Sequence, residues 1–121
     1  MKASVRRLAA ASEFATPEGC SIVEVSNSPD DPAASIARAR VAPGVTTQWH
    51  RLAETAERYV ILEGSGRVDI GDRPPEDVHP GDVVLIPPMC RQRITNTGST
   101  DLVFLAICTP RFERGRYEAL C

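Results

Sequence analysis

The sequence predicts an all-β fold, either a sandwich, a jelly roll or a barrel, for the whole chain of 121 residues. Eight short segments are rich in Val, Ile and Thr, and several of them alternate apolar with polar residues, as half-buried strands do. Gly, Pro, Asp and Asn separate these segments, and none of them has a long helical period. These observations indicate a single all-β domain that spans residues 1–121, because this length suits one hydrophobic core.

The first five predicted strands are separated by short turn sequences. A strand at 20–27 (CSIVEVSN) is followed by SPDDP, and a strand at 35–42 (SIARARVA) is followed by APG. The next strand, 46–52 (TTQWHRL), leads into 57–63 (ERYVILE), which the EGSG turn separates from 66–70 (GRVDI).

The second half of the chain continues the same pattern. GDRPPED and HPGD precede a strand at 82–87 (DVVLIP), PPM separates it from 91–96 (RQRITN), and NTGST precedes 101–108 (DLVFLAIC). The tail at 110–121 (PRFERGRYEALC) lacks strand alternation, and we expect a short closing helix there.

Composition and charge exclude several classes of function. The chain has 14 Lys and Arg against 16 Asp and Glu, a net charge of −2, and its basic residues are scattered, so no nucleic-acid partner is expected. No apolar run approaches the ~20 residues of a membrane helix, so no membrane partner is expected either. Ser12 and Glu13 interrupt the apolar run near the N-terminus, which predicts a cytoplasmic protein without a signal peptide.

The four cysteines do not predict a disulfide or zinc framework. They form no CxxC pair and have no zinc-finger spacing, and a cytoplasmic chain keeps its thiols reduced. The cysteines are Cys20, Cys90, Cys108 and Cys121.

Strand alternation predicts which side chains face the interior of a closed sheet. Side chains two apart point to the same side, and a small barrel can hold one compact ligand among its inward side chains. The expected inward residues on two successive strands are Gln48, His50, Leu52, Glu57, Tyr59 and Ile61.

The buried imidazole of His50 and carboxyl of Glu57 need partners in such an interior. An isolated charge in an apolar cavity is strongly disfavoured. A metal ion, a mutual hydrogen bond or a bound substrate would each remove this cost, and the residues alone leave these three possibilities open.

The first part of this region resembles a motif of the cupin superfamily. Gly44, His50, Glu57 and Gly64 have the spacing of the first cupin motif, G-x5-H-x-H-x4-E-x6-G. Leu52 stands where that motif has its second histidine.

A second resemblance follows at the expected distance. Gly81, Pro87 and Asn96 have the spacing of the second cupin motif, G-x5-P-x-G-x2-H-x3-N. Met89 replaces the glycine of that motif, and Gln92 replaces its histidine.

The resemblance implies a small single-domain cupin with a double-stranded β-helix, or jelly-roll barrel. The first motif occupies about 43–64 and the second about 80–96. The resemblance also implies a homodimer, for which Val60 and Leu62 beside Trp49 could supply an apolar outward patch.

The altered motifs leave the metal question open. Carried over position by position, the resemblance implies that His50, Glu57 and Gln92 hold a divalent metal such as Mn, Fe, Ni or Zn. Glu54 is expected in a solvent-facing loop and is a reserve ligand because it lies close to Leu52. Their oxygen-rich set favours ions such as Mn(II) or Fe(II). The alternatives are a metal-free cluster of hydrogen-bonded polar side chains and a purely structural core.

Two classes of function fit these residues. One is a small-molecule enzyme of oxygenase, lyase or isomerase type, in which His50 and Glu57 are catalytic, through a metal or as an acid and base. The other is a module that binds or senses a small ligand without turnover. The remaining residues expected in the substrate pocket are Gln48, Leu52, Tyr59 and Cys108.

Overall fold

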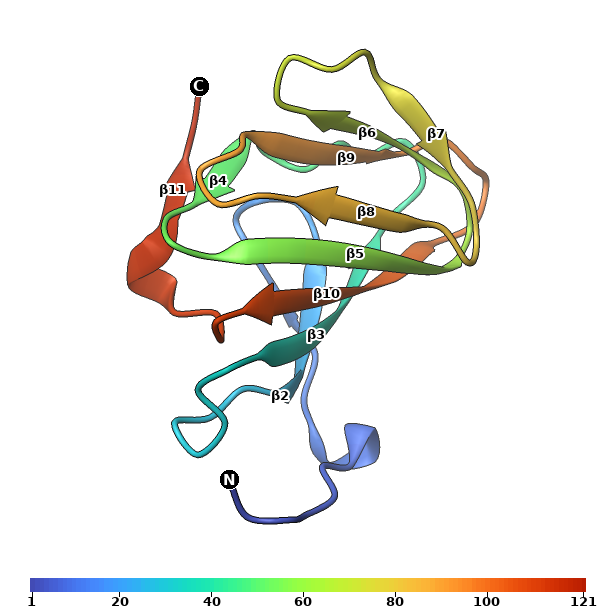
Figure 1. The fold of residues 1–121 in the computed structure, drawn as a ribbon. Coiled ribbons are helices and arrows are strands. Elements are labelled where there is room, and N and C mark those ends of the chain that lie inside the picture. The colour runs from blue at the N-terminus through green and yellow to red at the C-terminus, as the bar shows by residue number, and fades with distance from the viewer.

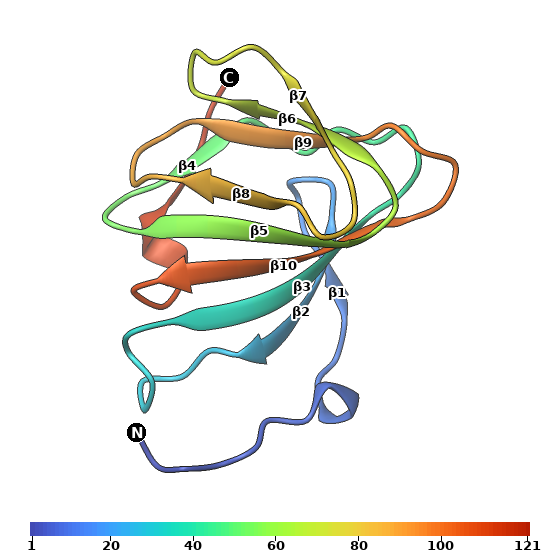
Figure 2. The same ribbon diagram turned by 45° about the vertical axis from the view of Figure 1, so that its right-hand side comes forward.

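Two antiparallel β-sheets face each other in the computed structural model, which describes residues 1–121 except Ala10 (Figure 1). The six-stranded sheet has the order β1-β2-β3-β10-β5-β8, and the five-stranded sheet has the order β11-β4-β9-β6-β7 (Figure 2). The strands are β1 (Phe14–Ala15), β2 (Ser21–Ser26), β3 (Ser35–Val41), β4 (His50–Leu52), β5 (Ala56–Glu63), β6 (Gly66–Ile70), β7 (Glu76–Val78), β8 (Val83–Ile86), β9 (Gln92–Asn96), β10 (Leu102–Thr109) and β11 (Tyr117–Ala119).

The predicted all-β jelly-roll fold is confirmed, and every predicted strand overlaps an observed one. The largest difference lies in the predicted strand 46–52, of which only His50–Leu52 forms β4. Thr46 instead makes an isolated bridge to Thr95, and their hydroxyls lie 2.9 Å apart.

Three short edge strands were not predicted. The expected closing helix at the tail is wrong, because Arg114–Arg116 form only a 3₁₀ turn (η2) and Tyr117–Ala119 then form β11. β11 pairs with β4, so the tail satisfies backbone groups that β4 would otherwise expose at a sheet edge. A helix as short as the tail allows would gain few internal hydrogen bonds in comparison.

The hydrophobic core fills one end of the space between the sheets. Alternate side chains of β5, β9 and β10 are buried, which follows from the period of two in a strand. Phe104 lies opposite Ile61 in the register of β10 and β5, and Ile94 lies opposite Val68 in β9 and β6. The largest fully buried apolar side chains are Ile61, Ile94, Leu102 and Val41.

Two of the turns with a left-handed backbone lie within the cupin motifs and bear on the sequence. Gly64 has φ of 81°, and a Cβ there would lie 2.6 Å from the carbonyl oxygen of Asp101, so only glycine fits. Met89 has φ of 65° at the position where the second motif has glycine. The turn has therefore kept its conformation although the residue suited to it is absent.

The expected outward patch of Val60, Leu62 and Trp49 is not formed. Val60 and Leu62 lie on β5 of the six-stranded sheet, whereas Trp49 precedes β4 of the other sheet. The guanidinium carbons of Arg91 and Arg93 lie 4.7 Å and 4.4 Å from the centroid of the Trp49 ring. The homodimer stays a prediction, with the apolar outer face of β5 and β8 as its remaining basis.

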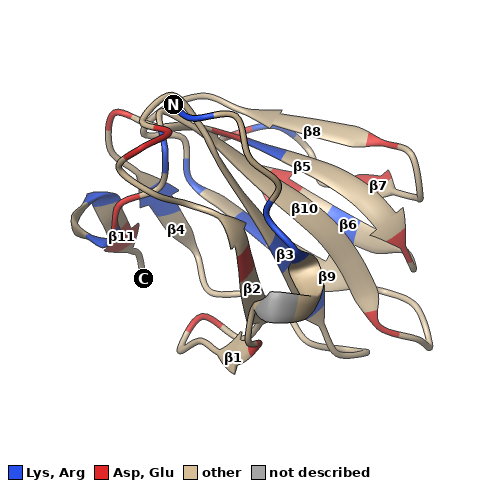
Figure 3. Ribbon diagram, turned by 90° about the horizontal axis from the view of Figure 1, so that it is seen from below, with Lys and Arg blue, Asp and Glu red and all other residues tan. Residues whose placement is uncertain are grey.

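Acidic and basic residues are interspersed along the strands rather than gathered by sign (Figure 3). In the described part of the chain, no helix has the length and hydropathy to cross a bilayer.

Candidate functional site

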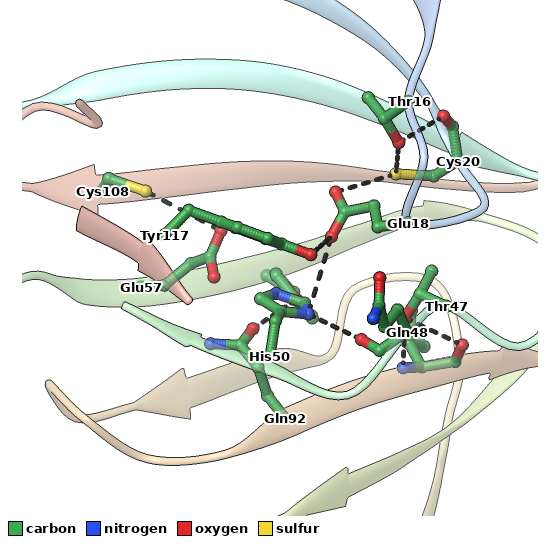
Figure 4. A network of polar contacts seen from close by, with 12 residues as sticks. Thr16, Glu18, Cys20, Thr47, Gln48, His50, Glu57, Gln92, Cys108 and Tyr117 are labelled. Carbon is green, nitrogen blue, oxygen red and sulfur yellow. Dashed lines mark hydrogen bonds and ion pairs between the residues drawn. The ribbon is translucent and has the colours of Figure 1, made fainter. Parts of the chain in front are cut away.

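Two pairs of polar side chains enter the space between the sheets at the end away from the core. On one sheet, Cys108 of β10 lies opposite Glu57 of β5, and on the other His50 of β4 lies opposite Gln92 of β9. All four side chains are buried. Figure 4 shows how the two sheets bring them around one space. Strand register thus forms each pair, and the packing of the two sheets brings His50, Glu57 and Gln92 to the same space.

Glu57 has a buried carboxyl that is only partly satisfied. Its Oε1 is buried and has no hydrogen-bond partner in the described structure, while Oε2 lies 3.7 Å from the Cys108 sulfur. Burial raises the pKa of Glu57 to about 7, and the negative charge of Glu18 adds to this rise. The Gln92 amide and the Cys108 thiol oppose the pKa rise in part, but Gln92 does not make a hydrogen bond to Oε1.

His50 is held with one ring nitrogen occupied. Its Nδ1 lies 2.8 Å from the carbonyl oxygen of Gln48, which can only accept, so Nδ1 carries a hydrogen. The same nitrogen lies 3.5 Å from Oε2 of Glu18. The ring stacks on Tyr117, with 5.1 Å between centroids and 20° between planes. With its hydrogen on Nδ1, the imidazole in its neutral form has a lone pair on Nε2 for a ligand or a proton.

Glu18 and Tyr117 belong to this site, although sequence reasoning missed both. Glu18 precedes β2, and its backbone oxygen accepts a 2.8 Å hydrogen bond from the amide of Gln48. Its carboxyl lies 3.5 Å from the Tyr117 hydroxyl and 3.2 Å from the sulfur of Cys20 (Figure 4). Neither residue lies in a recognisable motif, and they are 99 positions apart, so no local signal could have paired them.

Gln92 is engaged by Tyr59. The Tyr59 hydroxyl donates a hydrogen bond to Oε1 of Gln92, and burial raises the pKa of this hydroxyl well above its usual value, so it remains a donor. The Tyr59 ring packs on Phe104 with centroids 4.5 Å apart. Tyr59, which was expected in the substrate pocket, lines only a small inner cavity of about 40 Å³.

A larger cavity of about 500 Å³ adjoins the buried polar side chains of His50, Glu57 and Cys108. Gln48, Leu52 and Cys108 line it together with His50 and Glu57, and their role in binding a substrate stays a prediction. Burial, with the nearby carboxyl of Glu57, raises the pKa of the Cys108 thiol, which therefore stays protonated. Most of the wall comes from segments outside the two motifs: residues 14–18, 22–27, 35–37 and 112–119.

The donor atoms fall short of three strong metal ligands. Leu52 offers no donor, and Oε1 of Gln92 accepts the Tyr59 hydroxyl with one of its two lone pairs. Glu57 and Nε2 of His50 are the two strong donors and the neutral Gln92 amide is a weak third, whereas catalytic metal sites usually have three protein ligands. Among the described residues, no three His, Cys, Asp or Glu side chains are grouped so that they could hold a metal ion. The reserve candidate, Glu54, is exposed and pairs with Arg116 at 3.1 Å.

Comparisons with known proteins agree with the fold and the motifs. Residues 37–108 match the family model of the cupin domain. The protein MJ1618 of Methanocaldococcus jannaschii, whose function is uncharacterised, is 34% identical over 86 residues, which cover 71% of this chain and 68% of that protein.

Two further relatives have named activities. The glucose-6-phosphate isomerase of Thermococcus gammatolerans is 38% identical over 63 residues, which cover 49% of this chain but only 33% of the isomerase. The solved structure of Pac13, a nucleoside dehydratase of Streptomyces, superposes with a TM-score of 0.82 at 15% identity, over 98% of this chain and 92% of that one. At this identity the superposition shows a shared fold.

Proposed function

The chain belongs to the cupin family, and from its polar cluster we propose that it is an enzyme that moves protons on a small molecule, of the lyase or isomerase type. Glu57 is the main acid and base of this proposal, and His50 is its partner across the cavity. The reaction class follows from the groups that face the cavity, because a carboxyl and an imidazole transfer protons.

The carboxyl of Glu57 is the observation that carries the proposal. A general base works best when its pKa lies near the pH at which the enzyme operates, and Glu57 has a pKa of about 7. Its Oε1 has no partner among the described residues although it is buried. A buried oxygen without a partner is costly, and a bound substrate would supply the missing hydrogen bond.

His50 supplies the second proton-transfer group. With a hydrogen on Nδ1, the neutral ring accepts a proton at Nε2, and the carboxylate of Glu18 at 3.5 Å supports the charged ring that results. In a dehydration, ionised Glu57 takes the proton from the carbon next to a carbonyl while charged His50 gives a proton to the departing hydroxyl. A C–H and a C–O bond break, a C=C bond forms, and one water molecule leaves.

The relatives support this class of reaction. One is an isomerase and another is a dehydratase, and both names denote reactions in which protons are moved without net oxidation. The proposed proton transfers use the side chains of Glu57 and His50 alone, so the reaction is written without a metal.

Solvent exchange tests the proposal before the natural substrate is known. The protein is incubated in D2O with a panel of small hydroxyaldehydes and hydroxyketones, and proton NMR follows the loss of the C–H signal next to the carbonyl. We expect exchange that increases as Glu57 ionises, with its midpoint near the pKa of about 7. Glu57→Gln should abolish it.

Glu63→Gln is the matched control, because Glu63 is an exposed carboxylate at the far end of the same strand. Exchange that persists in Glu57→Gln at the parent rate would contradict the proposal. Compounds that bind at the cavity but never exchange would instead identify a ligand-binding module.

A further inference from the structure

We infer that the cavity takes an uncharged small molecule built on a ring and rich in hydroxyl groups, and that it disfavours phosphorylated compounds. This inference rests on the proposed function, because it concerns the same cavity. It goes further by naming the class of substrate from the walls.

The size and the apolar walls indicate a ring. A cavity of about 500 Å³ lies within the usual range for small-molecule sites. Phe14, Phe112 and Tyr117 bring aromatic rings to its wall, and Ile22 and Ile36 add aliphatic surface. Phe14 and Ile36 are exposed although they are apolar. A ligand with a flat or puckered ring would cover this surface.

The charges of the cavity disfavour an anion. Glu18, Glu24 and Glu57 bring three carboxyl groups to the lining, whereas Arg114 is its only Lys or Arg among the described residues and His50 adds a positive charge only when it is protonated. A phosphate dianion would meet the carboxylates at short range, where the effective dielectric constant is far below that of water. Glu18 already acts on Glu57 in this way, since its charge helps to raise the pKa of that carboxyl.

The backbone also lacks the features that bind phosphate. Phosphate sites commonly use the N-terminus of a helix or a loop of several amide groups. In the part of the chain that the structure describes, the helical elements are two 3₁₀ turns of three residues each. Carboxylates are acceptors, so the excess of acceptors over donors in this cavity favours a ligand that donates, as hydroxyl groups do.

Matched pairs of ligands that differ by one phosphate test the inference. Calorimetry or thermal shift is used to measure binding of glucose against glucose 6-phosphate, and of uridine against uridine 5′-monophosphate. We expect the uncharged member to bind at least about tenfold more tightly in a pair that binds, because two or more carboxylates oppose the added charge.

Three variants identify the cause of the discrimination. Glu24→Gln should reduce the difference in affinity between the uncharged and the phosphorylated compound, because it removes a negative charge from the lining. Arg114→Gln should increase that difference, because it removes a positive charge. Glu63→Gln removes the same charge as Glu24→Gln but lies outside the lining, so it should leave the difference unchanged.

Tighter binding of the phosphorylated member would overturn the inference, and so would failure of both uncharged compounds to bind at millimolar concentration. The outcome is separable from that of the proposed function. Uncharged ligands that bind without C–H exchange would uphold the substrate class and contradict the enzyme, whereas exchange on a phosphorylated compound alone would do the reverse.

Discussion

Replacing Glu57 by Gln should stabilise the protein at neutral and alkaline pH, because the fold holds the Glu57 carboxyl where its charge is disfavoured. The amide has the same shape as the carboxyl but never ionises. In the folded state the pKa of Glu57 is about 7, against 4.5 for the free side chain. At about 1.36 kcal/mol per pKa unit, full ionisation of Glu57 costs about 3 kcal/mol of folding free energy.

The sign of the pH dependence follows from proton binding. Between pH 4.5 and about 7 the folded state holds more protons than the unfolded state, since the pKa of Glu57 is raised on folding. Stability contributed by protonated Glu57 is therefore lost as the pH rises through this window. The free energy of unfolding of the parent should fall relative to that of Glu57→Gln by about 2 kcal/mol between about pH 5 and about pH 8.

Urea unfolding of both proteins at several pH values measures this difference. Subtracting the two curves cancels the other ionisable groups, which the two proteins share. Glu63→Gln, on the exposed end of β5, should run parallel to the parent at every pH. A difference between parent and Glu57→Gln that does not change with pH, or that changes in the opposite direction, would refute the reasoning about burial.

Three other substitutions test single features of the fold and the site. The double variant Leu52→His with Gln92→His should bind about one Mn, Fe, Ni or Zn ion per chain, because it restores two nitrogen ligands. Elemental analysis measures the metal content of the variant and the parent. A parent that already holds one ion per chain would contradict the interpretation that it has only two strong donors. Gly64→Ala should cost about 2–4 kcal/mol in urea unfolding, since the new Cβ would lie 2.6 Å from a backbone oxygen, whereas Gly115→Ala, which meets nothing within 4 Å, should stay within about 1 kcal/mol of the parent. Met89→Gly should change the melting temperature little or raise it, because relief of the left-handed backbone offsets the added freedom of the unfolded chain, and a large drop would show that the Met89 side chain stabilises the turn.

The central strands could be predicted from the sequence because each carries its own alternation. That alternation also placed His50, Glu57 and Cys108 on the inner side, and all three are buried. A strand has only two faces, so once its apolar residues identify the inner face, every other side chain is assigned to one face or the other. β11 could not be predicted in this way. It is three residues long, and its pairing with β4 depends on an edge that exists only after the barrel has closed.

The residues of the candidate site could be predicted from the sequence only within the two cupin motifs. Glu18 contacts His50 from a turn before β2, and Tyr117 stacks on it from the last strand. Neither contact has a local signature. The hydrogen bond from Tyr59 to Gln92 could not be predicted from the sequence either, although it occupies one of the two lone pairs of the amide oxygen that a metal would use. Two side chains that both point into the barrel can form a hydrogen bond with each other as readily as with a ligand. Only the three-dimensional structure shows which of these two contacts is made.

The division of the cavity between barrel strands and edge segments has a consequence for how this protein could change. Glu57 lies on a central strand and His50 in the five-stranded sheet, where both are tied by register to the core. Most of the ligand-facing wall belongs to residues 14–27 and 112–119, at the margins of the two sheets. Substitutions of the lining residues in these margins, which leave out the buried Cys20 and Val23, alter what enters the cavity while they leave most of the core packing intact. A library confined to them should therefore yield folded proteins of new specificity far more often than a library of equal size in the central strands.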